Sequence, residues 1–342
     1  MKLGKVAQEP AESHKGSGTS TPNPPPPTEG SDLLPKTLSG KIIAALTPRL
    51  RELRFSLHLM AKSSTSIAGL ALLAFLVFVA LVPWLFASPE PGTANPFQIP
   101  FNKYVRDPLP PGSSWENQTY HLGTGLNGAD IYYGIVWGAR ISMSFAVQVV
   151  GASVIIGILL GLVSGYKGGI IDEFVMRVTD IFLSIPSLIL VMAIAAVLGR
   201  DLGATKLALM AVWWSGYTRL VRGQVLSIRE NTYVDAARAS GSGEIKIMFR
   251  HILPNSWAPL IVSATMDMGT IVLVMAGLSY LGLGAPSGYA EWGKMVYDGQ
   301  QWFMAGKWWM VLFPGLAILT FVLAFNMMGD GLRDVLDPKL RR

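Results

Sequence analysis

The chain contains no cysteine among its 342 residues, which excludes disulfides, thiolate metal sites and cysteine nucleophiles. Charge is also scarce, because Asp, Glu, Lys and Arg make up 15% of the residues, against about 25% in soluble domains. So few charges could not cover the water-facing surface of a protein of this size. Hydrophobic residues make up 51% of the chain, and we infer that lipid faces much of the molecule.

The first 40 residues lack an apolar core, so we expect no cleavable signal peptide. They are rich in Pro, Ser, Gly and Thr, with consecutive prolines at 24–27. Such a segment cannot bury enough apolar area to offset its chain entropy, and residues 1–40 are interpreted as a disordered cytoplasmic tail. A polyproline docking site for a partner domain is the alternative.

Residues 41–65 are interpreted as a basic amphipathic segment at the membrane surface. Thr47 and Pro48 suit the start of a helix. Three leucines that follow would share one face of this helix while arginines lie on the others, as is typical of helices on anionic membranes. A solvated helix leading into the first span is the alternative.

Six apolar segments predict membrane-spanning helices: residues 67–87, 141–166, 181–198, 202–221, 257–281 and 309–328. The first has 21 uncharged residues, enough to cross about 30 Å of hydrocarbon at about 1.5 Å per residue. Pro186 is expected to kink the third, and the fourth is the weakest because it contains Lys206 and Arg219. Glycines at every fourth position from Gly157 to Gly165 predict close helix packing. The sequence therefore predicts an all-α integral membrane protein of about six transmembrane helices.

The distribution of Lys and Arg predicts the orientation of these helices. Basic residues concentrate in four segments that a cytoplasmic N-terminus would place inside, at 1–65, 166–179, 218–256 and 329–342. Because basic residues favour the cytoplasmic side, we expect both termini in the cytoplasm. The formal net charge of +6 then follows from topology, and we expect a lipid membrane rather than nucleic acid as the partner.

The loop between the fourth and fifth predicted spans carries the most informative pattern. Residues 235–239 predict a short helix, and Gly241 with Gly243 allows a sharp reversal. Ser242 suits the cap of a second helix that Pro254 would end. We expect four residues to give this second helix an apolar side: Ile245, Ile247, Met248 and Ile252. Such a helix–turn–helix could convey motion from a soluble partner into the spans, although periodicity alone also allows an inert connector.

This loop resembles the EAA loop of ABC importer permeases, which reads Glu-Ala-Ala, then Gly, then Ile-x-Leu-Pro. Six residues match the motif in type and spacing: Asp235, Ala236, Ala237, Gly241, Leu253 and Pro254. In that family the loop forms the coupling helix that sits in a groove on the ATPase subunit. The resemblance therefore implies that residues 229–256 form an ATPase-coupling loop. Asp235 replaces the usual Glu, and His251, where Ile is usual, is interpreted as a helix-end side chain.

Further motifs resemble the second permease subunit of dipeptide/oligopeptide ABC importers. They lie at residues 122–124, 138–142, 185–187, 278–284, 291–293, 313–315 and 329–338. The resemblance implies the ABC importer permease fold, with a five-helix core plus an N-terminal helix. The first helix and an extracytoplasmic loop would occupy residues 66–140, the permease core 141–330, and a cytoplasmic C-terminal tail 331–342.

Four positions depart from the usual pattern of that family and bear on the cargo. Gly125 and Ala129 replace an Asp and an Arg on the outer side, where Asp130 remains. Met275 replaces an acid that is common in the fifth span, and Asp267 lies two turns earlier.

Asp267 and Gln148 are the candidate residues of a translocation pathway. A charge at the centre of a membrane helix costs about 2.5–3.5 kcal/mol on insertion scales, so Asp267 is expected to face a cavity or a partner. A structural hydrogen bond between helices is the alternative for each residue. A lone acid also suits a proton-coupled carrier, but the sequence offers no second intramembrane ionisable group for a relay.

Residues 288–294 have the Gly and Lys spacing of a phosphate-binding loop, but Met295 stands where Ser or Thr would ligate Mg²⁺. We therefore expect no catalytic residue, cofactor-binding site or metal in this chain, with ATP and Mg²⁺ used by partner subunits.

The resemblance also implies the partners and the location. They are a homologous second permease subunit, two ATPase subunits and an extracytoplasmic solute-binding protein, in the cytoplasmic membrane of a bacterium or archaeon. The expected function is ATP-driven import of di- or oligopeptides through a pathway of which this chain forms half. Import of oligosaccharides or nickel chelates by the same machine is an alternative, and an ion-coupled secondary carrier is a third.

Overall fold

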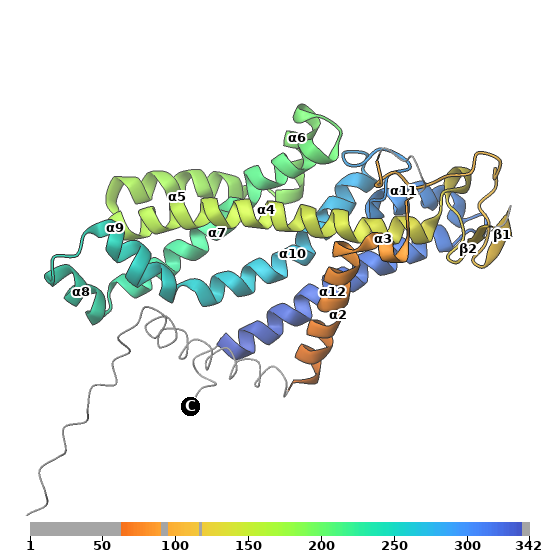
Figure 1. Ribbon diagram of the computed structural model, residues 1–342. Coiled ribbons are helices and arrows are strands. Elements are labelled where there is room, and N and C mark those ends of the chain that lie inside the picture. Colours follow the sequence, from red (N-terminus) through yellow and green to blue (C-terminus); the bar gives the residue numbers. More distant parts are fainter. Residues whose placement is uncertain (1–62, 90–94, 116–117, 337–342) are drawn as a thin grey trace, which may run out of the picture. The chain divides into compact units, whose positions relative to one another are not determined.

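Helices form most of the part of the chain that the structure describes. A computed structural model describes residues 63–89, 95–115 and 118–336 (Figure 1). The expected tail at 1–40, nearly all of the basic segment at 41–65 and the last residues of the C-terminal tail lie outside the described residues.

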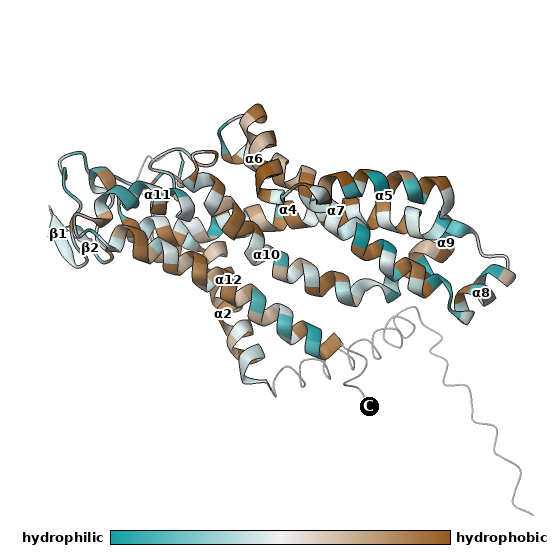
Figure 2. Cartoon of the chain, turned by 180° about the vertical axis from the view of Figure 1, so that it is seen from behind, coloured by the Kyte–Doolittle hydropathy of each residue, from teal (hydrophilic) through white to brown (hydrophobic). Residues whose placement is uncertain are grey.

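Within these ranges, four helices are long and apolar enough to cross a membrane. They are α2 (Ser64–Leu81), α4 (Ile131–Lys167), α10 (Trp257–Tyr280) and α12 (Trp309–Leu336). The pair α5 (Gly169–Ser184) and α6 (Ser187–Leu198) makes a fifth candidate span, bent by 92° at the break between them. Hydrophobic residues cover α6, whereas hydrophilic residues recur along α5 (Figure 2). These helices confirm the predicted all-α membrane fold.

The helix α7 (Leu202–Arg229), predicted as the fourth span, does not meet the same test of length and composition. It runs eight residues past the predicted end, and two of its arginines pair with acids of α5. Arg222 donates two hydrogen bonds, of 2.5 and 2.6 Å, to the carboxylate of Asp172, and Arg219 pairs with Asp180. Of the six expected spans, the one with the weakest sequence pattern is therefore a helix with two arginines that are compensated by acids of a neighbouring helix.

The helices α4 and α7 pack closely through a row of glycines. A Cβ atom on Gly157 would lie 2.3 Å from the Cβ of Tyr217, and one on Gly165 would lie 2.8 Å from the Cβ of Val225. Gly161 meets the α7 backbone in the same way. No side chain fits at these positions, so the two backbones approach each other, and the predicted close packing is confirmed.

The helix α4 begins ten residues earlier than predicted. Asp130 caps it, because its Oδ1 accepts the backbone N–H of Tyr132 at 2.9 Å and that of Tyr133 at 3.4 Å. With 37 residues, α4 is about 55 Å long, which exceeds the roughly 30 Å of a bilayer's hydrocarbon core. The helix therefore extends beyond the membrane.

The first predicted span is divided in the structure. The helix α2 ends at Leu81, and Pro83 starts the short α3 (Pro83–Phe86). The long helices α10 and α12 pack on each other, and α2 packs on α12, where Gly69 meets the backbone of Met327 and Met328.

We refer to the described residues 95–115, 118–130 and 282–308, which gather around the start of α4, as the loop-rich end. They include the antiparallel strands β1 (Ser113–Trp115) and β2 (Gln118–Tyr120), with Ser113 opposite Tyr120, and the short turn η1 (Leu126–Gly128). The helix α11 (Trp292–Phe303) packs on α12 and α10. The indole N–H of its Trp292 donates to the carbonyl oxygen of Ile135 in α4 at 3.1 Å.

Candidate coupling loop and transmembrane cavity

Residues 229–256, the coupling loop, fold as two helices joined by a tight turn. The first helix is α8 (Thr232–Ala239). The second begins as α9 (Glu244–Ile247), continues as the π-helical turn η2 (Met248–Ile252) and ends as the 3₁₀ turn η3 (Leu253–Asn255). The predicted helix–turn–helix is therefore confirmed as a local structure.

The reversal between the two helices depends on Gly241. Its φ of +76° lies in the left-handed region, which glycine adopts without steric cost. The backbone N–H of Ser242 donates to the carbonyl oxygen of Ala237 at 3.1 Å and closes the turn. Gly243, with φ −65° and ψ 153°, is ordinary extended backbone. It also occupies the cap position of α9 without a side-chain bond, so the prediction that Ser242 caps this helix is wrong.

One side of the second helix anchors the loop to the rest of the protein. Ile247, Met248 and Ile252 are buried as predicted, and Val234 anchors α8 in the same way. Ile245 is 71% exposed, so its assignment to the same apolar side is wrong. A regular α-helix would place Ile245 on one face with Met248 and Ile252, but the π-helical turn η2 departs from that spacing.

The opposite side of the coupling loop is exposed. Of the six residues of the family motif, Asp235, Ala236, Gly241 and Pro254 are exposed. Ala237 and Leu253 are half-buried. Asp235 pairs with Arg238 at 3.1 Å, but an exposed pair of this kind contributes at most about 1 kcal/mol. The motif residues therefore present a surface rather than a core.

Pro254 marks a change of helix type rather than the predicted end of the helix. The chain stays helical through Asn255, and Ser256 ties this turn back through a 3.1 Å bond from its Oγ to the carbonyl oxygen of Ile252. The helix α10 begins at the next residue, Trp257. The connection from the coupling loop to α10 therefore contains no extended segment.

Asp267 lies on α10 and binds two residues of α7. Its Oδ2 accepts a 2.6 Å hydrogen bond from the hydroxyl of Tyr217 and a 3.2 Å bond from the indole N–H of Trp213. The side chain also lines a cavity of ≈ 670 Å³, which we name the Asp267 cavity. Both interpretations of Asp267, a helix-to-helix hydrogen bond and a position on a cavity, are thus seen in the structure.

The Asp267 cavity lies where α7 and α10 meet the break between α5 and α6. Residues 182–187, which include Pro186, form one wall, and α6 stands away from the line of α5 at this point (Figure 1). Among the fourteen residues that line the cavity, Asp267 alone is charged. The predicted kink at Pro186 is therefore a break that opens space beside Asp267.

Gln148 lies elsewhere. It is exposed on α4, and its Oε1 accepts a 2.9 Å hydrogen bond from the Nζ of Lys206. It does not line the Asp267 cavity, so the structure does not bring the two candidate pathway residues together.

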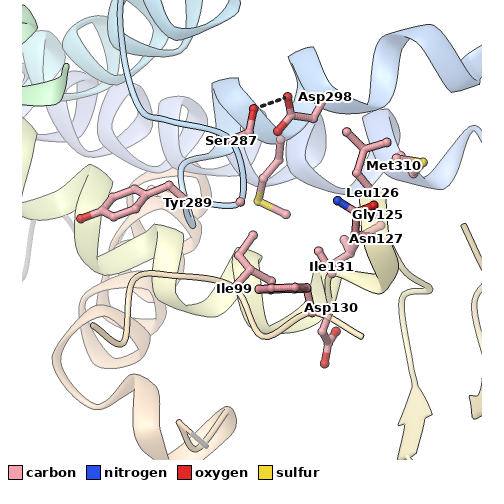
Figure 3. A pocket seen from close by; sticks show the side chains of 14 residues that line it. Ile99, Gly125, Leu126, Asn127, Asp130, Ile131, Ser287, Tyr289, Asp298 and Met310 are labelled. Atoms are coloured by element: carbon pink, nitrogen blue, oxygen red, sulfur yellow. Dashed lines mark hydrogen bonds between the residues drawn. The ribbon is translucent and has the colours of Figure 1, made fainter. Parts of the chain in front are cut away.

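A second pocket, which sequence patterns did not predict, lies at the loop-rich end (Figure 3). Its volume is ≈ 220 Å³, and its lining combines residues 125–127 and 129–131 with side chains that include Ile99, Tyr289, Asp298 and Met310. Gly125 and Ala129, the two small replacements noted in the sequence, both line it. No single segment carries this pocket, because its walls come from parts of the chain that are far apart in sequence.

Residues 288–294, which have the Gly and Lys spacing of a phosphate-binding loop, contribute to the capped start of α11 instead. Glu291 is fully buried and caps α11, where its two carboxylate oxygens accept the backbone N–H groups of Gly293 at 2.9 Å and Lys294 at 2.8 Å. Burial raises the pKa of Glu291 above its ordinary value. Lys294 pairs with Asp298 at 3.0 Å. The amides that a phosphate would need at this helix start are therefore occupied by a carboxylate.

A shallow cavity of ≈ 570 Å³ separates the turn between α4 and α5 from the coupling loop. Lys167 and Gly168 line it on one side, and Arg238 and Glu244 line it on the other. The end of α4 thus lies beside the loop that follows α7.

An all-α membrane protein with an exposed coupling loop and a cavity between its spans has the features of a transport permease. Residues 157–342 match the family described as "Binding-protein-dependent transport system inner membrane component". The chain therefore belongs to this family, the membrane-embedded permease subunits of ABC importers.

The regions of similarity with several relatives cover most of this chain and most of each relative. The dipeptide transport system permease protein DppC of Alkalihalophilus pseudofirmus is 40% identical over 282 residues, which are 82% of this chain and 88% of the relative. The probable D,D-dipeptide transport system permease protein DdpC of Escherichia coli is 41% identical over 263 residues, or 77% and 85%. The di/tripeptide transport system permease protein DppC of Pseudomonas aeruginosa is 39% identical over 285 residues, or 82% and 90%.

Proposed function

We propose that this permease subunit forms half of the pathway through which an ATP-driven importer carries di- or oligopeptides into the cell. The names of the relatives, all permeases for dipeptides or tripeptides, support this cargo. The other half of the pathway comes from a homologous second permease subunit, and an extracytoplasmic binding protein delivers the peptide. The host is a bacterium or an archaeon, and the importer lies in its cytoplasmic membrane.

The coupling loop carries the proposal. Its motif residues are exposed on two short helices, and the second helix continues into α10, which bears Asp267. Two ATPase subunits supply ATP and Mg²⁺ chemistry in trans, and one of them binds this surface. Closure of the ATPases moves the loop, and α10 and α7 then alternate the access of the Asp267 cavity.

The orientation of the chain in the membrane follows from the role proposed for the coupling loop. A loop that binds an ATPase must lie in the cytoplasm, and the Lys and Arg distribution places both termini on that side as well. The loop-rich end then faces outward, where a binding protein would dock.

Reconstitution of the complete importer in proteoliposomes tests the proposal. Uptake of a radiolabelled dipeptide should require internal ATP and the binding protein, and it should survive collapse of the proton gradient by an ionophore. Uptake that persists without ATP and stops with the ionophore would show an ion-coupled carrier instead. A parallel assay with a nickel chelate and an oligosaccharide distinguishes a different cargo from a failed preparation.

A further inference from the structure

The charge of Asp267 has no basic partner among the residues that the structure describes. The ion pairs found there do not include Asp267. Its two hydrogen-bond donors, the phenol of Tyr217 and the indole of Trp213, are neutral, and both bind Oδ2. Oδ1 takes part in neither bond and remains for another donor.

The rest of the Asp267 cavity suits a cation. None of its fourteen lining residues is Lys, Arg or His, so no fixed positive charge competes for the carboxylate. Phe182 and Trp213 contribute half-buried aromatic rings to the lining, and the faces of such rings attract ammonium groups. A lone carboxylate within a membrane span is costly, and an incoming cation offsets that cost.

We propose that Asp267, together with the rings of Trp213 and Phe182, binds the α-ammonium group of a peptide as it crosses the Asp267 cavity. The inference rests on the peptide cargo of the proposed function and adds to it the subsite and the part of the peptide that is recognised. Tyr217 and Trp213 hold the carboxylate in place through Oδ2, and the ammonium group binds Oδ1. A peptide whose amino group is acetylated carries no positive charge there and binds weakly.

The absence of cysteine from the chain permits a direct test of the charge in the cavity. Ser263 lines the cavity, and Ser263→Cys places one thiol there. The complete importer in nanodiscs, in which both membrane faces are accessible, is treated with a cationic or an anionic methanethiosulfonate. Modification of this chain is followed by its mass, so cysteines of other subunits do not interfere.

The proposal predicts that the cationic reagent reacts faster than the anionic one by roughly tenfold or more, because an uncompensated charge acts strongly in a cavity of low dielectric. Adding Asp267→Asn, which keeps an oxygen for Tyr217 and Trp213, should reduce this ratio to that of Ser88→Cys. Ser88 is exposed and lies outside both the cavity and the coupling loop. An equal ratio with and without the Asp267 carboxylate would overturn the inference. Ser187→Cys, at another wall of the cavity, repeats the test if Ser263→Cys does not assemble.

A second arm tests the ligand. Dialanine should slow modification of the Ser263→Cys thiol several-fold, whereas N-acetyl-dialanine should not, and Asp267→Asn should abolish the difference. Equal protection by both compounds would overturn ammonium recognition. A third outcome is that the ratio of the two reagents depends on Asp267 and that ethylammonium protects the thiol, but dialanine does not. The cavity then binds a cation, and the assignment of a peptide as its ligand is wrong. If the cationic and anionic reagents modify Ser263→Cys equally fast in an importer that still takes up dipeptides with ATP, this inference is refuted and the proposed function is not.

Discussion

Tyr217 of α7 donates a 2.6 Å hydrogen bond to Asp267 of α10 at the wall of the Asp267 cavity. Tyr217→Phe keeps the ring and removes the bond, which leaves the carboxylate only the longer bond from Trp213. We expect a loss of about 1–3 kcal/mol in stability, as for other hydrogen bonds to charged groups. Thermal unfolding of the purified importer measures this loss. The exposed Tyr104 provides the control, and equal unfolding temperatures for Tyr217→Phe and Tyr104→Phe would contradict the assignment.

Gly241 and Gly243 form a matched pair for the coupling loop. Gly241→Ala forces a side chain into the left-handed region, which costs about 1–2 kcal/mol, whereas Gly243 has a backbone that any residue adopts. Gly241→Ala should therefore reduce peptide uptake and its coupling to ATP hydrolysis, and Gly241→Trp should abolish uptake while membrane insertion remains normal. Gly243→Ala should transport like the native chain. Normal uptake by Gly241→Trp would remove the coupling role.

Gly157 and Gly151 distinguish close helix packing from helix propensity on α4. A Cβ at Gly157 would lie 2.3 Å from the Cβ of Tyr217, but one at Gly151 meets nothing within 4 Å. Gly157→Ala should destabilise the protein by about 1–3 kcal/mol through overpacking, and Gly151→Ala should leave stability unchanged or raise it by up to about 1 kcal/mol. The unfolding temperature and the yield of assembled importer report both effects. A neutral Gly157→Ala would show that α4 and α7 pack less closely.

Arg222 and Asp172 form the half-buried ion pair between α7 and α5. Arg222→Ala leaves the carboxylate without its two charged hydrogen bonds, and we expect a loss on the order of 1–3 kcal/mol. The double variant Arg222→Asp with Asp172→Arg should recover part of that loss. Arg177→Ala is the control, because its pair with Glu173 is exposed and should contribute less than about 1 kcal/mol. Equal losses from Arg222→Ala and Arg177→Ala would contradict the role given to the α5–α7 pair.

Asp130 caps α4 through one oxygen that accepts two backbone N–H groups. Burial raises the pKa of Asp130 above its ordinary value, so the folded state favours the protonated form. The stability that this shift provides is fully present below the pKa of Asp130 in the unfolded chain, which is about 4. It is lost as the pH rises through the higher pKa of Asp130 in the folded chain. Asp130→Asn keeps the accepting oxygen and should remove this decline with pH, whereas Asp130→Ala should cost about 1 kcal/mol at every pH through loss of the cap. Unfolding curves between pH 4 and pH 8 distinguish the two, and a pH profile of Asp130→Asn that matches the native chain would refute the assignment.

Local patterns were sufficient where backbone chemistry alone decides the structure. The left-handed turn at Gly241, the break at Pro186 and the row of glycines on α4 follow from conformational limits that act within a few residues or from the need for small side chains in close packing. Each could therefore be predicted from its own segment of sequence.

The remaining features depend on partners far away in the chain. Of the two basic residues that weakened the prediction of α7, Arg219 pairs with Asp180 on α5 and Lys206 donates a hydrogen bond to Gln148 on α4. No pattern within α7 indicates either partner. The pocket at the loop-rich end needs four separate segments, and the early start of α4 depends on Asp130 acting as a cap rather than as part of an extended loop. The exposure of Ile245 could not be predicted from helical periodicity, because a regular α-helix places Ile245 on one face with Met248 and Ile252, and the π-helical turn η2 departs from that spacing.

The helix α4 is so long that a small tilt displaces both of its ends. Its capped start at Asp130 borders the pocket at the loop-rich end, and its last residue, Lys167, borders the cavity beside the coupling loop. Each half of α4 is about 28 Å long, so a tilt of about 5° around the midpoint of the helix displaces each end by roughly 2.4 Å. Because the glycine row packs α4 against α7 along the second half, a displacement at one end of α4 would also displace the helix that donates hydrogen bonds to Asp267.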